Sequence, residues 1–245
     1  MRITHVTDCY LPRIGGIELQ VNEIAHRQAL AGHDVHVVTA SPSDQDGDAY
    51  PPWVHRLCPA GPAQVGFSPY RRVGELIGMI GPDVVHVHAS VLSPLATAAA
   101  IHAARTSRPT VVTVHSLWAY LSTPYRLAAR ATRLAALPIE WTAVSACAAE
   151  QVRGVIGADR QVGVVPNGID ADYWRQTARA ERREEVCVAA VMRLSARKRP
   201  LAVLAALRRA RSQLPAGVGL RAVILGDGPQ RGLMNAYLRA HRMQD

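Results

Sequence analysis

The sequence predicts an α/β protein with two parallel sheets. Short, valine-rich runs such as residues 110–114 alternate with longer segments whose apolar residues recur at helical spacing. Apolar runs of this kind are typical of strands that are buried on both faces of a parallel sheet. A polar segment at residues 175–185, rich in arginine and glutamate, interrupts the alternation. We therefore predict a first domain at residues 1–170 and a linker with a second domain at residues 171–245.

Each element of the first domain has its own signal in the sequence. The expected strands span residues 3–7, 35–39, 54–57, 83–88, 110–114, 141–145 and 162–165. The expected helices span residues 18–31, 70–80, 95–104, 124–137 and 146–155. Gly32 ends the first helix as a C-cap, and Gly81-Pro82 ends the second.

The second domain repeats the pattern. Strands are expected at residues 186–192 and 220–225, and each is followed by a helix. Pro200 and Pro229 open these helices, since proline is well tolerated in the first turn.

The loop after the strand at residues 186–192 is the strongest candidate site. Arg193 follows the strand directly, and Lys198 is the single lysine among 28 lysines and arginines. Ligands of open α/β sheets bind at the carboxyl ends of strands, so both cations are placed where an anion would bind. The alternative is a solvated loop between a strand and a helix that binds no ligand.

Three further features lie at predicted strand ends. Gly15 and Gly16 precede the first helix, where backbone N–H groups can approach an anion, although the spacing does not match the dinucleotide fingerprint. His115 ends a buried strand. His86 and His88 share one face of their strand, because side chains alternate with a period of two. We predict that they line the sheet edge and hold no metal, since no acidic partner stands at ligand spacing.

Composition narrows the class of protein. The net charge of +9 suits nucleic acid, a membrane surface or an anionic substrate. Basic repeats interleaved with aromatic residues are absent from the sequence, which argues against nucleic acid. The four cysteines share no metal-type spacing, and we expect buried, reduced thiols in a cytoplasmic protein. Arg126, Arg130 and Arg133 lie on one face of the helix expected at residues 124–137, which favours a solvated face or, alternatively, contact with an anionic membrane at its inner side.

The motifs together resemble the retaining glycosyltransferases of family 4. The resemblance covers the whole chain and rests on the order and spacing of YLPRIGGIE, DVVHVH, VVTVHS, VVPNGID, RLSARK and ILGDGP. It implies the GT-B fold, with two Rossmann-like domains, and transfer of a sugar from a nucleotide diphosphate donor with retention of configuration. It also implies a UDP- or GDP-sugar donor, no cofactor or metal, and an acceptor that is lipid-linked in many relatives.

The resemblance assigns roles to the candidate residues. Arg193 and Lys198 match the basic pair that grips the donor diphosphate, and Gly15 and Gly16 match the loop that approaches the phosphate and the sugar. His115 matches a histidine beside the donor sugar.

The chain departs from the family pattern at its end. Two glutamates eight residues apart, which hold the nucleotide in the family, are not found before Asp245, so the second domain is expected to be incomplete and the 245 residues alone inactive. The alternatives are a truncated, non-catalytic sugar-nucleotide-binding protein and a nucleotide-sugar epimerase of the same fold.

Overall fold

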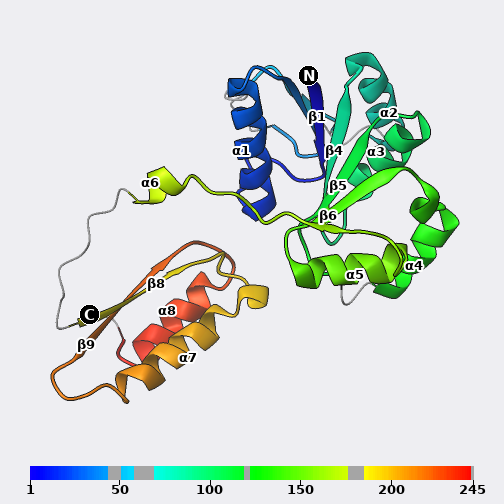
Figure 1. Ribbon diagram of the computed structural model, residues 1–245. Helices are drawn as coiled ribbons and strands as arrows, with labels where there is room; N and C mark the ends of the chain where they lie inside the picture. The colour runs from blue at the N-terminus through cyan, green and yellow to red at the C-terminus, as the bar shows by residue number, and fades with distance from the viewer. Residues whose placement is uncertain (44–50, 58–68, 119–121, 176–184, 244–245) are drawn as a thin grey trace, which may run out of the picture. The chain divides into compact units, whose positions relative to one another are not determined.

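The fold consists of two compact units, Met1–Ile169 and Asp170–Asp245, each described here by itself (Figure 1). The computed structural model describes residues 1–43, 51–57, 69–118, 122–175 and 185–243. Within these ranges, no helix is long and apolar enough to cross a lipid bilayer.

A seven-stranded parallel sheet organises the first unit. Its strands are β1 (Arg2–Thr7), β2 (Asp34–Thr39), β3 (Val54–Arg56), β4 (Val84–Ala89), β5 (Thr110–Val114), β6 (Ile139–Ala143) and β7 (Gly163–Val164). The spatial order is β3-β2-β1-β4-β5-β6-β7, so the chain turns back across β1 after β3. The predicted α/β class with a parallel sheet is confirmed.

Helices cover both faces of this sheet (Figure 1). They are α1 (Gly16–Leu30), α2 (Pro69–Ile80), α3 (Pro94–Arg105), α4 (Ser122–Ala131) and α5 (Ala146–Ile156). The larger core forms between the sheet and α2 to α5, while α1 packs on β2 in a smaller core.

The two faces of the sheet differ in chemistry. Val6, Val87 and Val112 point into the larger core with α2 to α5. Side chains alternate along a strand, so His5 and His88 lie on the opposite face, the face of α1. Both histidines are fully buried, at 0% and 1% exposure. The strands β1 and β4, whose valines indicate burial, therefore carry imidazoles on their second face.

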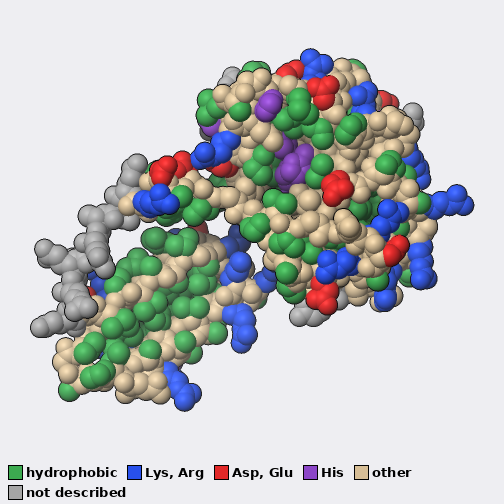
Figure 2. Space-filling model, in the orientation of Figure 1, with side chains coloured by type: hydrophobic (Ala, Val, Ile, Leu, Met, Phe, Trp, Pro, Cys, Tyr) green, Lys and Arg blue, Asp and Glu red, His purple; other side chains and the backbone are tan. Residues whose placement is uncertain are grey.

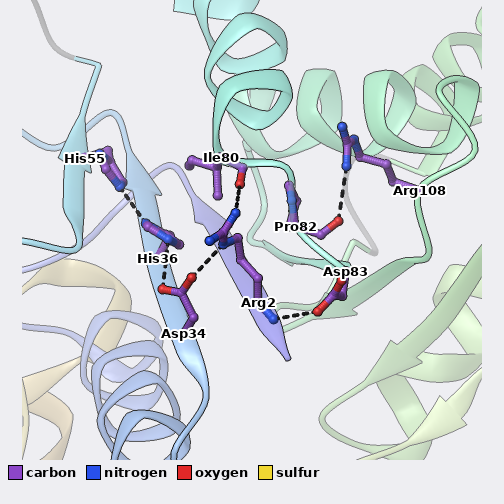
Figure 3. Close-up of polar contacts among 8 residues, drawn as sticks. All are labelled: Arg2, Asp34, His36, His55, Ile80, Pro82, Asp83 and Arg108. Atoms are coloured by element: carbon purple, nitrogen blue, oxygen red, sulfur yellow. Dashed lines mark hydrogen bonds and ion pairs between the residues drawn. The ribbon is translucent and has the colours of Figure 1, made fainter.

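The amino edge of the sheet is held by one arginine (Figure 3). The Arg2 side chain donates to Asp34 Oδ2 on β2 at 2.6 Å and to the Ile80 carbonyl at the end of α2 at 2.7 Å. Its backbone N–H donates to Asp83, just before β4, at 2.7 Å. The hydrogen bond from Arg2 lowers the pKa of the Asp34 carboxyl group. This network joins the starts of β1, β2 and β4 and lies at the edge of the sheet opposite His115.

The second unit is a parallel pair of strands backed by two helices. The helix α6 (Ala171–Arg175) begins the unit, and β8 (Glu185–Val191), α7 (Pro200–Arg211), β9 (Gly219–Leu225) and α8 (Arg231–Ala240) follow. Leu194, Leu204, Leu207 and Met234 form its core.

One face of the second sheet is open. Hydrophobic side chains gather along β8 and β9 in Figure 2. Val191 at the end of β8 is 79% exposed, and Leu225 at the end of β9 is 56% exposed. Within the described part of this unit, the core forms on the helix side of the pair alone.

Several sequence-based expectations were wrong. Pro229 does not open the last helix, which begins at Arg231. The helix expected at residues 124–137 ends at Ala131, because Arg133 adopts a left-handed conformation (φ 53°) and a short 3₁₀ helix follows. The strand expected at residues 141–145 begins two residues earlier, at Ile139. The thiols of Cys147 and Cys187 are exposed, not buried. Cys58 and most of the polar segment at residues 175–185 lie outside the described residues.

Candidate functional site

His115 lies at the carboxyl edge of the first sheet, directly after β5. Its backbone N–H donates to the Ala89 carbonyl at 2.8 Å, which extends the β4–β5 pairing by one residue. This pairing fixes the imidazole beside the end of β4 and leaves the side chain half-buried. The position agrees with the sequence prediction of a polar side chain at a strand end.

A row of hydrogen-bonded side chains leads from α1 to His115. Gln28 Oε1 lies 2.7 Å from His5 Nε2, and His5 Nδ1 lies 3.0 Å from His88 Nε2. His88 Nδ1 in turn lies 3.0 Å from His115 Nε2. We call these four residues the histidine chain. It crosses β1, β4 and the end of β5, which are neighbours in the sheet.

His86, the other histidine of β4, makes a separate hydrogen bond. His86 Nε2 lies 2.7 Å from Thr113 Oγ1, and the Thr113 hydroxyl contacts the Thr142 hydroxyl at 2.7 Å. The centroids of the His86 and His88 rings are 4.2 Å apart, so the two side chains do share a face, as predicted.

Burial keeps these imidazoles neutral. It lowers the pKa of His5 to about 4, against a hydrogen bond to the Gln28 oxygen that raises it. It lowers the pKa of His86 to about 3, and the pKa of His88 falls well below its ordinary value for the same reason. Burial also lowers the pKa of His115 to about 4, with Asn167 opposing the shift. An isolated charge is costly to bury, so all four rings are uncharged at neutral pH.

His5, His86 and His88 are close enough together to be considered as metal ligands. One ring nitrogen from each lies within 4.8 Å of the others. Both nitrogens of His5 and both of His88 already take part in hydrogen bonds, however. A metal would have to displace the contact between His5 and His88, and the prediction that the cluster holds no metal stays a prediction.

Gly15 and Gly16 lie at the start of α1, on the same sheet edge as His115 and separated from it by the end of β4. Gly16 is the first residue of the helix, which begins two residues earlier than predicted. A Cβ atom on Gly15 would stand 2.4 Å from a carboxylate oxygen of Glu18, so this flexible side chain would have to shift if Gly15 were replaced. Glu18 is 4% exposed and pairs with Arg13 at 3.1 Å.

Acidic side chains therefore lie at two of the helix starts at this edge, those of α1 and α3. Asp8, which follows β1, accepts hydrogen bonds from the N–H groups of Leu95 at 2.9 Å and Ala96 at 3.0 Å in the first turn of α3. Glu18 lies against the start of α1. The sequence analysis singled out neither residue, although an acidic residue in a first helical turn is a readable signal for Glu18.

Arg193 and Lys198 share one loop in the second unit, as predicted. Arg193 follows β8, and residues 196–198 form a 3₁₀ helix that ends with Lys198. Arg199 then adopts a left-handed conformation (φ 54°) and caps α7, which Pro200 begins. Both predicted cations are exposed. The loop thus presents two positive charges at the carboxyl end of a parallel strand.

The loop after β9 holds the basic loop in place. The Leu194 N–H donates to the Asp227 carbonyl, and the Gln230 N–H donates to the Leu194 carbonyl, each at 2.9 Å. Gly226 has φ 148°, and a Cβ atom there would lie 1.8 Å from the Met192 carbonyl oxygen. Only glycine allows this approach, and the glycines of ILGDGP, which contributed to the family resemblance alone, are the sequence signal for it.

A basic hollow lies on the surface of the first unit beside α4 and α5. Its volume is about 480 Å³. Its lining includes four arginines, Arg126, Arg130, Arg133 and Arg153. The three arginines predicted to share a helix face do not share one, since Arg133 lies beyond the end of α4. They nevertheless line one concave surface, and we call this feature the basic hollow.

Comparison with known families identifies the chain. The model of Glycosyltransferase Family 4 matches residues 14–173, which is most of the first unit. The chain belongs to this family. The resemblance inferred from the sequence motifs is confirmed at this level, and Gln28, His88 and His115 of the histidine chain lie within the residues that the family model covers.

Curated relatives of the chain are longer than it is. The gpi3 subunit of phosphatidylinositol N-acetylglucosaminyltransferase from Schizosaccharomyces pombe is 23% identical over 98% of the chain and 54% of its own length. Glycogen synthase from Mycobacterium tuberculosis is 28% identical over 99% of the chain and 66% of its own length. The chain therefore spans between about half and two thirds of the length of these relatives.

Solved structures share the fold. A glycosyltransferase from Rickettsia africae aligns over 100% of the chain and 66% of its own length, with a TM-score of 0.62 and 13% identity. The catalytic domain of starch synthase IV from Arabidopsis thaliana, bound to ADP and acarbose, aligns over 98% of the chain and 71% of its own length, with a TM-score of 0.57 and 13% identity. At this identity the likeness concerns the fold alone, and the predicted GT-B type is confirmed.

Proposed function

We propose that the protein takes part in the transfer of a sugar from a nucleoside diphosphate donor to an acceptor, with retention of configuration. The observation that carries the proposal is the loop with Arg193 and Lys198, which the glycine turn at residues 226–228 holds at the carboxyl ends of β8 and β9. Two fixed cations at this edge suit a diphosphate. Membership of the family and solved structures that contain UDP or ADP support the same reading.

The chemistry needs charge stabilisation more than a protein nucleophile. When the bond between the sugar and the diphosphate breaks, negative charge develops on the departing phosphate oxygens. Arg193 can bind two oxygens with its planar guanidinium group, and Lys198 acts as a point charge. Cations that are already in position stabilise such a transition state without further reorganisation. In this proposal the two side chains do what a metal ion does in other transferases.

The acceptor we propose is linked to an anionic lipid. The fission yeast relative is named as an enzyme of phosphatidylinositol. The basic hollow would attract phosphate groups at a membrane surface, where each nearby basic residue contributes about 1 kcal/mol. A polysaccharide acceptor is the alternative, since the mycobacterial relative is named glycogen synthase.

Calorimetric titration with UDP, GDP and ADP tests the donor site. Each charge-assisted hydrogen bond to the diphosphate contributes about 1.5–3 kcal/mol. Arg193→Ala and Lys198→Ala should therefore each weaken binding of the preferred nucleotide more than about tenfold. Arg209→Ala, at an exposed arginine in the last turn of α7, is the matched control and should bind like the wild type. If all three variants bind equally well, the basic loop does not hold the diphosphate.

A further inference from the structure

The hydrogen bonds of the histidine chain all run in one direction, and Gln28 determines that direction. A neutral imidazole has one N–H donor and one acceptor nitrogen, so each ring in a row must donate one way and accept the other way. The Gln28 oxygen can only accept, and it lies 2.7 Å from His5 Nε2. His5 must therefore carry its proton on Nε2 and present a lone pair on Nδ1.

The same requirement passes along the row to its end. His5 Nδ1 accepts from His88 Nε2–H at 3.0 Å, which leaves the lone pair of His88 on Nδ1. His88 Nδ1 accepts from His115 Nε2–H at 3.0 Å. The proton of His115 is thus on Nε2, and its Nδ1 atom presents a lone pair. One amide on α1 determines the tautomer of a ring at the sheet edge.

The far end of the chain is the Nδ1 atom of His115. His115 Nδ1 is a buried side-chain atom that makes no hydrogen bond of good geometry to any residue that the structure describes. The exposed side chain of Asn167 approaches this ring, so the end of the chain lies beside the surface. A buried acceptor that makes no hydrogen bond costs free energy, and a ligand that brings a donor recovers it.

We propose that Gln28, His5 and His88 are positioning residues that hold His115 as the Nε2–H tautomer, so that its Nδ1 atom accepts a hydrogen bond from a hydroxyl group of the bound sugar. The proposal rests on the proposed function for the identity of the ligand. It also predicts selectivity, because an acceptor nitrogen favours a hydroxyl over a fluorine or a hydrogen atom at that position of the sugar.

Two other roles for the row fit the structure less well. A proton wire requires rings that gain and lose a proton readily, whereas burial keeps these rings neutral. A metal centre requires free ring nitrogens, whereas both nitrogens of His5 and of His88 are engaged. A role in orienting the His115 ring accounts for every hydrogen bond in the histidine chain.

The first experiment needs no ligand. Long-range ¹H–¹⁵N correlation spectra of the ¹⁵N-histidine-labelled chain at pH 7.5 report which nitrogen of each ring carries the proton. We expect His5, His88 and His115 to be neutral Nε2–H tautomers. A proton on Nδ1 of His115, or a charged ring among the three, would overturn the proposal.

The second experiment reverses the direction of the hydrogen bonds in the histidine chain. Gln28→Lys supplies a donor beside His5, and His26→Asn, at an exposed histidine of the same helix, is the control. A donor at position 28 forces each ring to the opposite tautomer, so His115 should become Nδ1–H in Gln28→Lys and stay Nε2–H in His26→Asn. If both variants fold and show the same tautomer at His115, the row does not transmit the choice.

Activity provides an independent measurement in any preparation that transfers sugar. In Gln28→Lys the Nδ1–H group of His115 would donate to the sugar hydroxyl instead of accepting from it. The preference for that hydroxyl over a fluorine atom, measured as a ratio of kcat/KM values, should therefore fall about fivefold to tenfold, whereas His26→Asn, at an exposed histidine of α1, should keep the preference. In a His115→Ala background, Gln28→Lys should have no further effect. A loss that persists in this background would show that Gln28 acts by another route. If no sugar is transferred by any version, the proposed function fails, and the spectra alone decide the histidine chain.

Discussion

Acid should unfold the first unit at a pH where most proteins are stable. His5, His86, His88 and His115 are buried and neutral, with each pKa lowered by burial. In the unfolded chain each ring has an ordinary pKa of about 6.5. Between these values the unfolded state binds more protons than the folded state, so stability falls as the pH falls. The stabilisation is complete above pH 6.5 and is lost progressively toward pH 4.

The loss is large because four rings act together. A histidine whose pKa is about 4 in the folded state lowers the free energy of unfolding by about 1.4 kcal/mol between neutral pH and pH 5.5. His5, His86 and His115 together lower it by about 4 kcal/mol, and the buried His88, whose pKa is also lowered, adds to this loss. The whole stability of a domain is about 5–15 kcal/mol, so the first unit should unfold between about pH 5 and pH 6.

Urea denaturation at a series of pH values measures this effect. Trp118 and Trp141 are buried in the larger core, so their fluorescence reports unfolding of the first unit. His86→Gln removes one titrating ring and should make the decline of stability with acid less steep. His26→Asn, at an exposed histidine of α1, removes one histidine from the surface as the control. An unfolding free energy that stays constant from pH 7.5 to pH 5.5 would refute the reasoning.

Two further predictions concern the second unit and the basic hollow. Gly226→Ala should destabilise the second unit by about 3 kcal/mol, because the added Cβ atom meets the Met192 carbonyl, and hydrogen exchange of the β8 and β9 amides should rise. Gly232→Ala, where a Cβ atom meets nothing within 4 Å, should leave exchange unchanged, and equal exchange in both variants would contradict the role of the turn. The chain should sediment with anionic liposomes at low salt and lose this binding at high salt, with neutral liposomes as the control. Replacement of the arginines of the basic hollow by alanine should abolish the binding, and unchanged binding would place the contact elsewhere.

The sequence predicted the elements well where local signals were strong. The strand at residues 110–114 was predicted with the bounds that β5 has, because a valine-rich run stands between clear breaks. The end of α4 was missed because alanine and arginine continue past Ala131 at helical spacing, whereas Arg133 turns left-handed. Local propensity does not encode such a turn when the residue is not glycine. The start of β6 was then placed two residues late.

Parts of the site could be predicted for the same reason. His115, Arg193 and Lys198 follow valine-rich strands, so their places at strand ends could be inferred from the sequence. The contact between Gln28 and His5 could not, since the two residues are 23 positions apart and meet only when α1 packs on the sheet. No spacing in the sequence indicates that pairing.

The imidazoles on the α1 face of the first sheet affect the register in which neighbouring strands pair. Strands such as β4 and β5 consist largely of valine, and a slip of two residues would return valine to nearly every position of the larger core. Apolar packing alone therefore distinguishes poorly between the native alignment and its neighbours.

Side-chain hydrogen bonds make that distinction. His5 bonds His88, two residues beyond its register partner His86. Thr113 bonds His86, two residues before its register partner His88. A two-residue slip would separate these partners and leave polar atoms buried without hydrogen bonds. Apolar residues in place of the histidines would give a sheet that still collapses but populates several alignments, since directional bonds would no longer select one.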